Sequence, residues 1–130
     1  MLVLTIRTDK PEAELGLYND GARLAYTSWH AHRELSTTIH LKIEELLKNQ
    51  SKTLQDLEGI VCFQGPGSFT GLRIGLTVGN AMAYAFSLPI VAAQDENWIE
   101  QGIARLERGE RDPLALPEYG AAANITVPKK

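Results

Sequence analysis

A glycine-rich turn is the segment of this chain best suited to hold an anion. It consists of Gly65, Pro66, Gly67, Ser68, Phe69, Thr70 and Gly71. It directly follows the apolar run 60–63, which is typical of a buried strand, and glycine and proline exclude both helix and strand there. Ser68 or Thr70 can cap a helix that begins at this turn. The unpaired N–H groups of such a helix end can bind a phosphate.

The familiar phosphate-binding loops do not match this turn. A Walker loop needs Lys and then Ser or Thr after its last glycine, whereas Gly71 is followed by Leu72 and Arg73. The dinucleotide-binding fingerprint needs a glycine where Thr70 stands. A tight turn explains the glycines equally well, so phosphate binding and a purely structural turn both stay open.

Other side chains that could do chemistry lack the neighbours they would need. His30 and His32 leave a predicted strand on one face and could chelate a metal, but no carboxylate pattern reinforces them, and solvent-facing histidines are the alternative. Ser68 does not stand in a nucleophile elbow. Glu44 and Glu45 diverge in direction and form no acid–base pair. We therefore predict no catalytic residue, no metal site and no cofactor.

The helix predicted over residues 70–86 has an unusual surface. Small residues recur at every fourth position, at Gly71, Gly75, Gly79 and Ala83. Each helical glycine costs roughly 1 kcal/mol relative to alanine, so the stripe indicates that another backbone approaches closely. No charged side chain occurs between Arg73 and Asp95, whereas a surface helix has a charged face. Either this helix is buried inside its own domain, or a second protein covers part of it.

Two ionisable residues could belong to an interface. The charge of Arg73 is unfavourable in the first turn of a helix, and a bound anion, a partner carboxylate or an internal salt bridge would offset it. His40 shares a helix face with Ser36 and Glu44, so we expect it at the surface or in an interface. Cys62, the single cysteine, lies in a predicted buried strand and excludes an internal disulfide.

Composition limits the classes of protein to consider. A chain of 130 residues should form one domain with a core of its own. Its net charge of −3 and its scattered basic residues give no electrostatic footprint for nucleic acid. Residues 1–6 lack the basic leader of a signal peptide, and glycine and proline interrupt the uncharged stretch 74–94, so we expect no membrane span and a cytoplasmic protein.

Hydrophobic periodicity predicts the order of the elements. Strands are expected over residues 2–6, 13–18, 23–29, 60–63 and 88–93, and helices over 34–49, 70–86 and 95–108. The first strand is apolar on both faces and therefore central in its sheet. Residues 19–21, Asn-Asp-Gly, signal a hairpin, and Asp95 is a candidate N-cap.

This order describes an α/β fold: a ribonuclease-H-like or actin-like ATPase half-domain, with a mixed five-stranded sheet and helices on both faces. The domain should cover residues 1–109. Residues 110–130, rich in proline and glycine, are expected to form an irregular tail that packs on the domain.

The segment 65–75, Gly-Pro-Gly-Ser-Phe-Thr-Gly-Leu-Arg-Ile-Gly, resembles the signature of the TsaB family, also called YeaZ, of bacterial tRNA threonylcarbamoyladenosine synthesis. The similarity extends over residues 1–94, where strand, hairpin, helix, signature and the strand after Leu88 follow in the family's order. A weaker counterpart of the signature occurs in TsaD, the catalytic relative.

The resemblance implies a non-catalytic partner subunit of a TsaD-like threonylcarbamoyltransferase, which modifies adenosine 37 of tRNAs. A TsaE-like ATPase joins the complex, tRNA is contacted only indirectly, and the isolated chain can form a homodimer. Pairing in the family runs through the helix after the hairpin and the glycine helix. The predicted contact residues are Leu35, Ile39, His40, Ile43, Leu47, Arg73, Gly75, Val78, Gly79 and Met82.

Two departures from the family bear on this prediction. The family's Asp-Thr pair after the first strand is Arg7-Thr8 here, and Arg7 cannot ligate a cation, while Asp9 should project differently. Family members continue into a second domain, so we expect a minimal version with the N-terminal domain only. The alternative function is a small nucleotide-binding ATPase-like enzyme that uses residues 65–71 for phosphate, which the loss of the aspartate makes less favourable.

Overall fold

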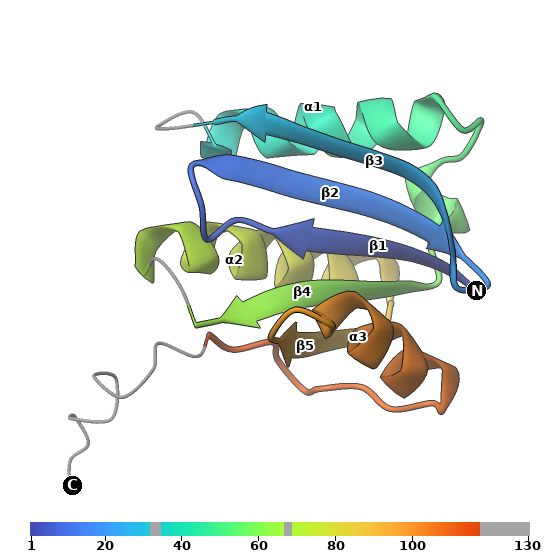
Figure 1. The fold of residues 1–130 in the computed structure, drawn as a ribbon. Coiled ribbons are helices and arrows are strands. Elements are labelled where there is room, and N and C mark those ends of the chain that lie inside the picture. The colour runs from blue at the N-terminus through green and yellow to red at the C-terminus, as the bar shows by residue number, and fades with distance from the viewer. Residues whose placement is uncertain (32–34, 67–68, 118–130) are drawn as a thin grey trace, which may run out of the picture.

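The computed structural model describes residues 1–31, 35–66 and 69–117 and confirms the predicted order of elements (Figure 1). The strands are β1 (Leu2–Arg7), β2 (Glu12–Asn19), β3 (Ala22–His30), β4 (Gly59–Gly65) and β5 (Ile90–Gln94). The α-helices are α1 (Leu35–Lys48), α2 (Phe69–Phe86) and α3 (Trp98–Glu107), and a short 3-10 helix, η2 (Leu54–Asp56), lies between α1 and β4.

The strands form one five-stranded mixed sheet in the order β3-β2-β1-β4-β5. The first three strands are an antiparallel meander, and β1, β4 and β5 run parallel to one another. The predicted hairpin is confirmed, because Asp20 (φ 53°) and Gly21 (φ 83°) take the left-handed backbone that such a turn requires. β1 is central and buried, as its apolar sequence indicates.

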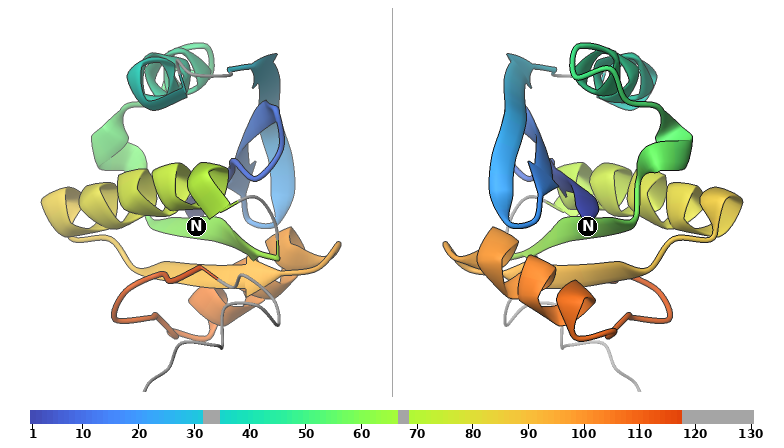
Figure 2. Two further views of the ribbon diagram at one scale, coloured as in Figure 1. Left: turned by 90° about the vertical axis from the view of Figure 1, so that its left-hand side faces the viewer. Right: turned by 90° about the vertical axis from the view of Figure 1, so that its right-hand side faces the viewer.

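Helices cover both faces of the sheet, α1 and α2 on one side and α3 on the other (Figure 2). Alternation along β4 explains the division. Cys62 lies against Gly79 of α2, whereas the neighbouring Val61 lies against Gly102 of α3. On the meander, the indole N–H of Trp29 donates to the hydroxyl oxygen of Thr38 of α1 at 3.3 Å. The core therefore has two layers, one on each face.

Two local predictions differ from the structure. Asp95 is not the N-cap of α3: its φ of 74° is left-handed, its carbonyl oxygen accepts the N–H of Trp98, and Asn97 takes the cap position. The segment between the predicted helix 34–49 and the predicted strand 60–63, for which no helix was expected, contains η2. The carboxylate of Asp56 accepts the backbone N–H of Thr53 at 2.8 Å and stabilises this turn.

Residues 110–117, here called the strap, run back from α3 along β5 (Figure 1). The backbone N–H of Asp112 donates to the carbonyl oxygen of Ile90 at 2.8 Å, and Ala115 is buried with 2% of its surface exposed. The remainder of the predicted tail, residues 118–130, lies outside the described residues. Among the helices of the described ranges, none combines the length and the apolar character that a bilayer span requires.

Candidate functional site

Thr8, the residue directly after β1, fixes the start of α2 to the sheet. Its buried hydroxyl donates to the carbonyl oxygen of Gly71 at 2.6 Å and accepts the N–H of Gly75 at 3.1 Å. A Cβ atom at either glycine would collide with Thr8. Glycine is therefore required at both positions, because the helix lies directly on the end of β1.

The glycine stripe of α2 faces the chain's own sheet. A Cβ atom at Gly79 would lie 2.5 Å from Sγ of Cys62 and 3.2 Å from Cδ1 of Ile90. The close approach that the stripe predicts is real, but the approaching groups belong to β1, β4 and β5. The stripe is thus explained by the chain's own sheet, and the contact of Gly75 and Gly79 with a partner stays a prediction that the stripe itself does not support.

The apolar contact residues predicted for the two helices are also buried in the chain's own core. None of them has more than 7% of its surface exposed; they are Leu35, Ile39, Ile43, Leu47, Val78 and Met82. His40 and Arg73 are exposed. The helical periodicity thus identified the inward face of each helix, so a docking surface would use mainly the flanking positions, with only the exposed edges of Ile43, Val78 and Met82.

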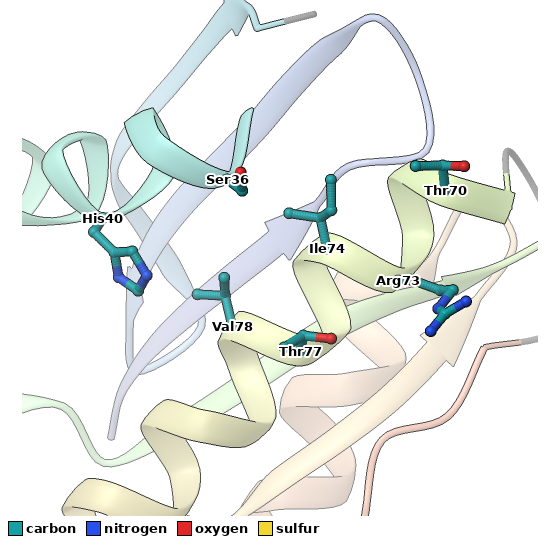
Figure 3. A pocket seen from close by; sticks show the side chains of 7 residues that line it. All are labelled: Ser36, His40, Thr70, Arg73, Ile74, Thr77 and Val78. Carbon is teal, nitrogen blue, oxygen red and sulfur yellow. The ribbon is translucent and has the colours of Figure 1, made fainter. Parts of the chain in front are cut away.

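A hollow of about 480 Å³ lies between those flanking positions of α1 and α2 (Figure 3). It is lined by Ser36, His40, Thr70, Arg73, Ile74, Thr77 and Val78. Ile74 and Val78 point towards α1, and the His40 ring points towards α2. The hollow therefore brings together His40 and Arg73, which the sequence analysis placed on different elements.

A second hollow, of about 240 Å³, continues along the same helix junction. Its lining is His40, Ile43, Glu44, Leu54, Ala81, Met82, Ala85 and Phe86. Because His40 lines both hollows, we treat them as one interhelical groove. The groove is mainly apolar, which suits it to bind apolar side chains.

The end of β1 is occupied by an internal ion pair. Nε of Arg7 donates to Oδ1 of Asp9 at 2.7 Å, and the guanidinium lies 3.8 Å from the centre of the Phe63 ring. Only 7% of the Asp9 side chain is exposed. The carboxylate nearest to the family's missing aspartate is thus neutralised by Arg7, an arrangement that does not favour a cation there.

Among the residues that the structure describes, the remaining candidates do not come together as a catalytic group. Gly65 (φ 114°) is the last residue of β4 and pairs with Gln94, although the sequence analysis excluded a strand there. Gly67 and Ser68 lie outside the described residues, as does His32. His30 is exposed at the end of β3. In the part of the chain that the structure describes, no group of three or more His, Cys, Asp or Glu residues is placed to hold a metal. Burial raises the pKa of Cys62 to about 12, so its thiol is not a nucleophile.

Sequence reasoning missed two polar residues that organise this region. For Thr8, the only feature of the sequence that pointed to a role was its position directly after the first strand. Asn80, half-buried on α2, forms two hydrogen bonds of 2.9 Å with the backbone of Ala115 in the strap. The absence of charge around Asn80 was visible in the sequence, but its partner, 35 residues further along the chain, was not.

Comparisons with known proteins agree with this geometry. The profile of the family described as "TsaD: tRNA N6-adenosine threonylcarbamoyltransferase" matches residues 29–117. The chain is 29% identical to the tRNA threonylcarbamoyladenosine biosynthesis protein TsaB of Escherichia coli, over 89% of this chain and 50% of that protein. It is 30% identical to the tRNA N6-adenosine threonylcarbamoyltransferase of Burkholderia thailandensis, over 91% of this chain and 36% of that protein.

Solved structures give the same result. The structure of YeaZ from Pseudomonas aeruginosa superposes with a TM-score of 0.68 at 26% identity, over 83% of this chain and 50% of that one. A Thermus thermophilus RuvC structure superposes with a TM-score of 0.54 at 15% identity, over 95% of this chain and 87% of that one, and shows the fold alone. The chain spans about half the length of the E. coli and Pseudomonas relatives.

The sheet order, the helices on both faces and these superpositions define an α/β domain of the ribonuclease-H-like and actin-like class, as the sequence predicted. Within that class, the chain belongs to the TsaB/YeaZ family, which is related to the TsaD transferases.

Proposed function

We propose that this chain is a non-catalytic partner subunit of a TsaD-like threonylcarbamoyltransferase and takes part in threonylcarbamoyladenosine modification of tRNA in the cytoplasm. It docks the interhelical groove against the catalytic subunit, and a TsaE-like ATPase joins the pair. The printed names of the E. coli and Burkholderia relatives support a place in this process, one as a biosynthesis protein and the other as the transferase.

The observation that carries this proposal is the uncharged outer surface of α2. Thr77, Ala81, Tyr84 and Ala85 are exposed, and no charged residue occurs in α2 after Arg73. Tyr84 has 91% of its surface exposed. An exposed helix face without charge, next to an apolar groove, is typical of a protein interaction site.

The end of β1 supports a role without catalysis. An active nucleotide site needs a free carboxylate for the metal, whereas Asp9 is held by Arg7 at 2.7 Å. The ATPase-like alternative would therefore rest on the glycine turn alone.

Binding to the TsaD-like protein of the same organism tests the proposal. Because Ile39 and Ile43 are core residues, substitutions there would unfold the chain, and the exposed Ala81 is the better site. We expect Ala81→Glu to weaken binding at least about ten-fold, since a desolvated carboxylate without a partner costs more than about 1.4 kcal/mol. The matched control is Ala22→Glu, which changes an exposed alanine at the far end of β3.

Equal binding by both variants would contradict the groove as the docking site. Calorimetry of the isolated chain with ATP and Mg²⁺ tests the alternative: we expect no micromolar binding, and micromolar binding would favour the ATPase-like function.

A further inference from the structure

The outer edge of β5 would be an open sheet edge without the strap. In the β4–β5 pair, the carbonyl oxygen of Pro89 accepts the N–H of Ile60 at 3.0 Å, so Pro89 directs its carbonyl towards β4. By alternation, Ile90 and Ala92 direct their N–H and C=O groups away from β4. Such a row of backbone groups is a template on which another strand can pair.

Asp112 covers this edge with one backbone group and one side-chain group. Its backbone N–H donates to the carbonyl oxygen of Ile90 at 2.8 Å, and its Oδ2 accepts the N–H of Ala92 at 2.8 Å. Nη1 of Arg105, from α3, donates to the carbonyl oxygen of Ala92 at 3.2 Å. The outward-facing groups of the strand's centre are therefore paired with the strap and α3.

The strap is held in this position at two points. Near its start, Nη2 of Arg105 donates to Oδ1 of Asp112 at 2.6 Å, and Nε of Arg105 donates to Glu110 at 2.9 Å. Near its end, the Asn80 amide pairs with both backbone groups of Ala115 at 2.9 Å. These are the contacts that would have to break for the β5 edge to open.

We propose that the strap is an autoinhibitory guard of the β5 edge, and that its release lets β5 pair with β5 of a second copy of this chain. The edge already accepts a backbone donor from outside the sheet, because the N–H of Asp112 donates to the carbonyl oxygen of Ile90. β5 carries no charged residue that would oppose pairing, and an isologous two-fold contact presents the same strand from both copies. This surface lies apart from the interhelical groove.

The test removes the contacts of the Asp112 side chain in a background that blocks association through the groove. In Ala81→Glu chains, we expect Asp112→Ala to speed hydrogen exchange at the Ala92 amide at least ten-fold. We also expect a concentration-dependent dimer in light scattering after gel filtration. Glu100→Ala, which changes an exposed carboxylate of α3, is the matched control and should change neither result.

An unchanged rate of hydrogen exchange at the Ala92 amide in Asp112→Ala would contradict the proposal that the strap protects the β5 edge. A faster rate in a variant that stays monomeric at about 200 µM would contradict the proposed pairing of two β5 strands. If Asp112→Ala does not fold by circular dichroism, Arg105→Gln and Asn80→Ala take its place, because they loosen the strap at either end without changing its sequence. Retained binding of the single variant Asp112→Ala, with Ala81 unchanged, to the TsaD-like protein separates this result from a failure of the proposed function.

Discussion

The hydroxyl of Thr8 is the smallest group on which the position of α2 depends. It stands between the carbonyl oxygen of Gly71 and the N–H of Gly75, which are an i, i+4 pair of the helix. Replacing the hydroxyl by a methyl group preserves the shape and removes both hydrogen bonds, although the two helix groups can still bond to each other.

We therefore expect Thr8→Val to lower the free energy of unfolding by roughly 1 kcal/mol, as a lost net hydrogen bond does. Urea denaturation measures the change. The control is Thr77→Val, at an exposed position of the same helix, which should stay within about 0.5 kcal/mol of the parent protein. Equal losses for both variants would show that Thr8 contributes only its β-branched shape.

A second prediction for a single residue concerns how the free energy of unfolding depends on pH at low pH. Burial by itself would raise the pKa of Asp112, but the hydrogen bonds from Arg105 and from the Ala92 N–H outweigh it, so the pKa is lowered from its ordinary 3.8. A lowered pKa contributes stability that is complete above 3.8 and is lost as the pH falls through the folded value.

Consequently, in Asp112→Asn the free energy of unfolding should decrease less steeply below pH 3.8 than in the parent protein. Between about pH 5 and pH 7 its change with pH should be the same in both proteins. Urea titrations at a series of pH values give the two slopes. A parent and a variant with parallel profiles down to pH 2 or about that value would contradict the assignment.

At the scale of elements, the packing of α2 on β4 depends on the absence of a side chain at Gly79. Alanine would raise the helix propensity by roughly 1 kcal/mol, but its Cβ would lie 2.5 Å from Sγ of Cys62. Overpacking of this kind costs about 1–3 kcal/mol, so Gly79→Ala should destabilise the chain in total.

A double-mutant cycle separates the two effects. In a Cys62→Ala background the sulfur is gone, and the added methyl group enters the space that it leaves. We expect Gly79→Ala to be neutral or stabilising there, as measured by urea denaturation, with a coupling free energy of about 1 kcal/mol or more. Purely additive changes would show that the helix shifts freely on the sheet.

The contact between Gly79 and Cys62 also illustrates which features of the fold the sequence alone could predict. Periodicity located the strands and helices within a few residues and found the inward stripe of α2, because burial repeats at a fixed spacing. Periodicity could not distinguish packing of Gly79 against β4 from packing against a second protein, because either close contact requires a small residue at that position. Asp95 was misassigned as a cap because an isolated Asp also suits a left-handed turn, which it forms with φ 74°.

The groove itself was beyond prediction for a related reason. His40 and Arg73 belong to helices separated by a strand, and only their packing on one sheet face makes them line the same hollow. The strap depends on equally distant pairs, such as Asn80 with Ala115. Long-range polar contacts between single residues leave no periodic trace in one sequence.

For the whole molecule, these contacts place the proposed docking groove and the proposed pairing edge at different parts of the surface. α1 and α2 lie together on one face of the sheet and present the interhelical groove, and α3 covers the other face (Figure 2). The strap follows the β5 edge between them and is bonded both to α3, through Arg105, and to α2, through Asn80. Cys62 lies in the layer between β4 and α2, beneath the proposed docking surface. The reactivity of its thiol therefore reports whether α2 stays packed on the sheet.

We expect Cys62 to resist thiol reagents such as DTNB in the native chain at pH 8 or about that value, because the side chain is 1% exposed and burial raises its pKa to about 12. Labelling then requires α2 to leave the sheet, so its rate follows the free energy of that opening. Thr8→Val, at a cost of roughly 1 kcal/mol, should speed labelling about five-fold, and Thr77→Val should leave it unchanged. Native labelling as fast as in urea would show that the groove rests on a mobile helix and not on a closed core.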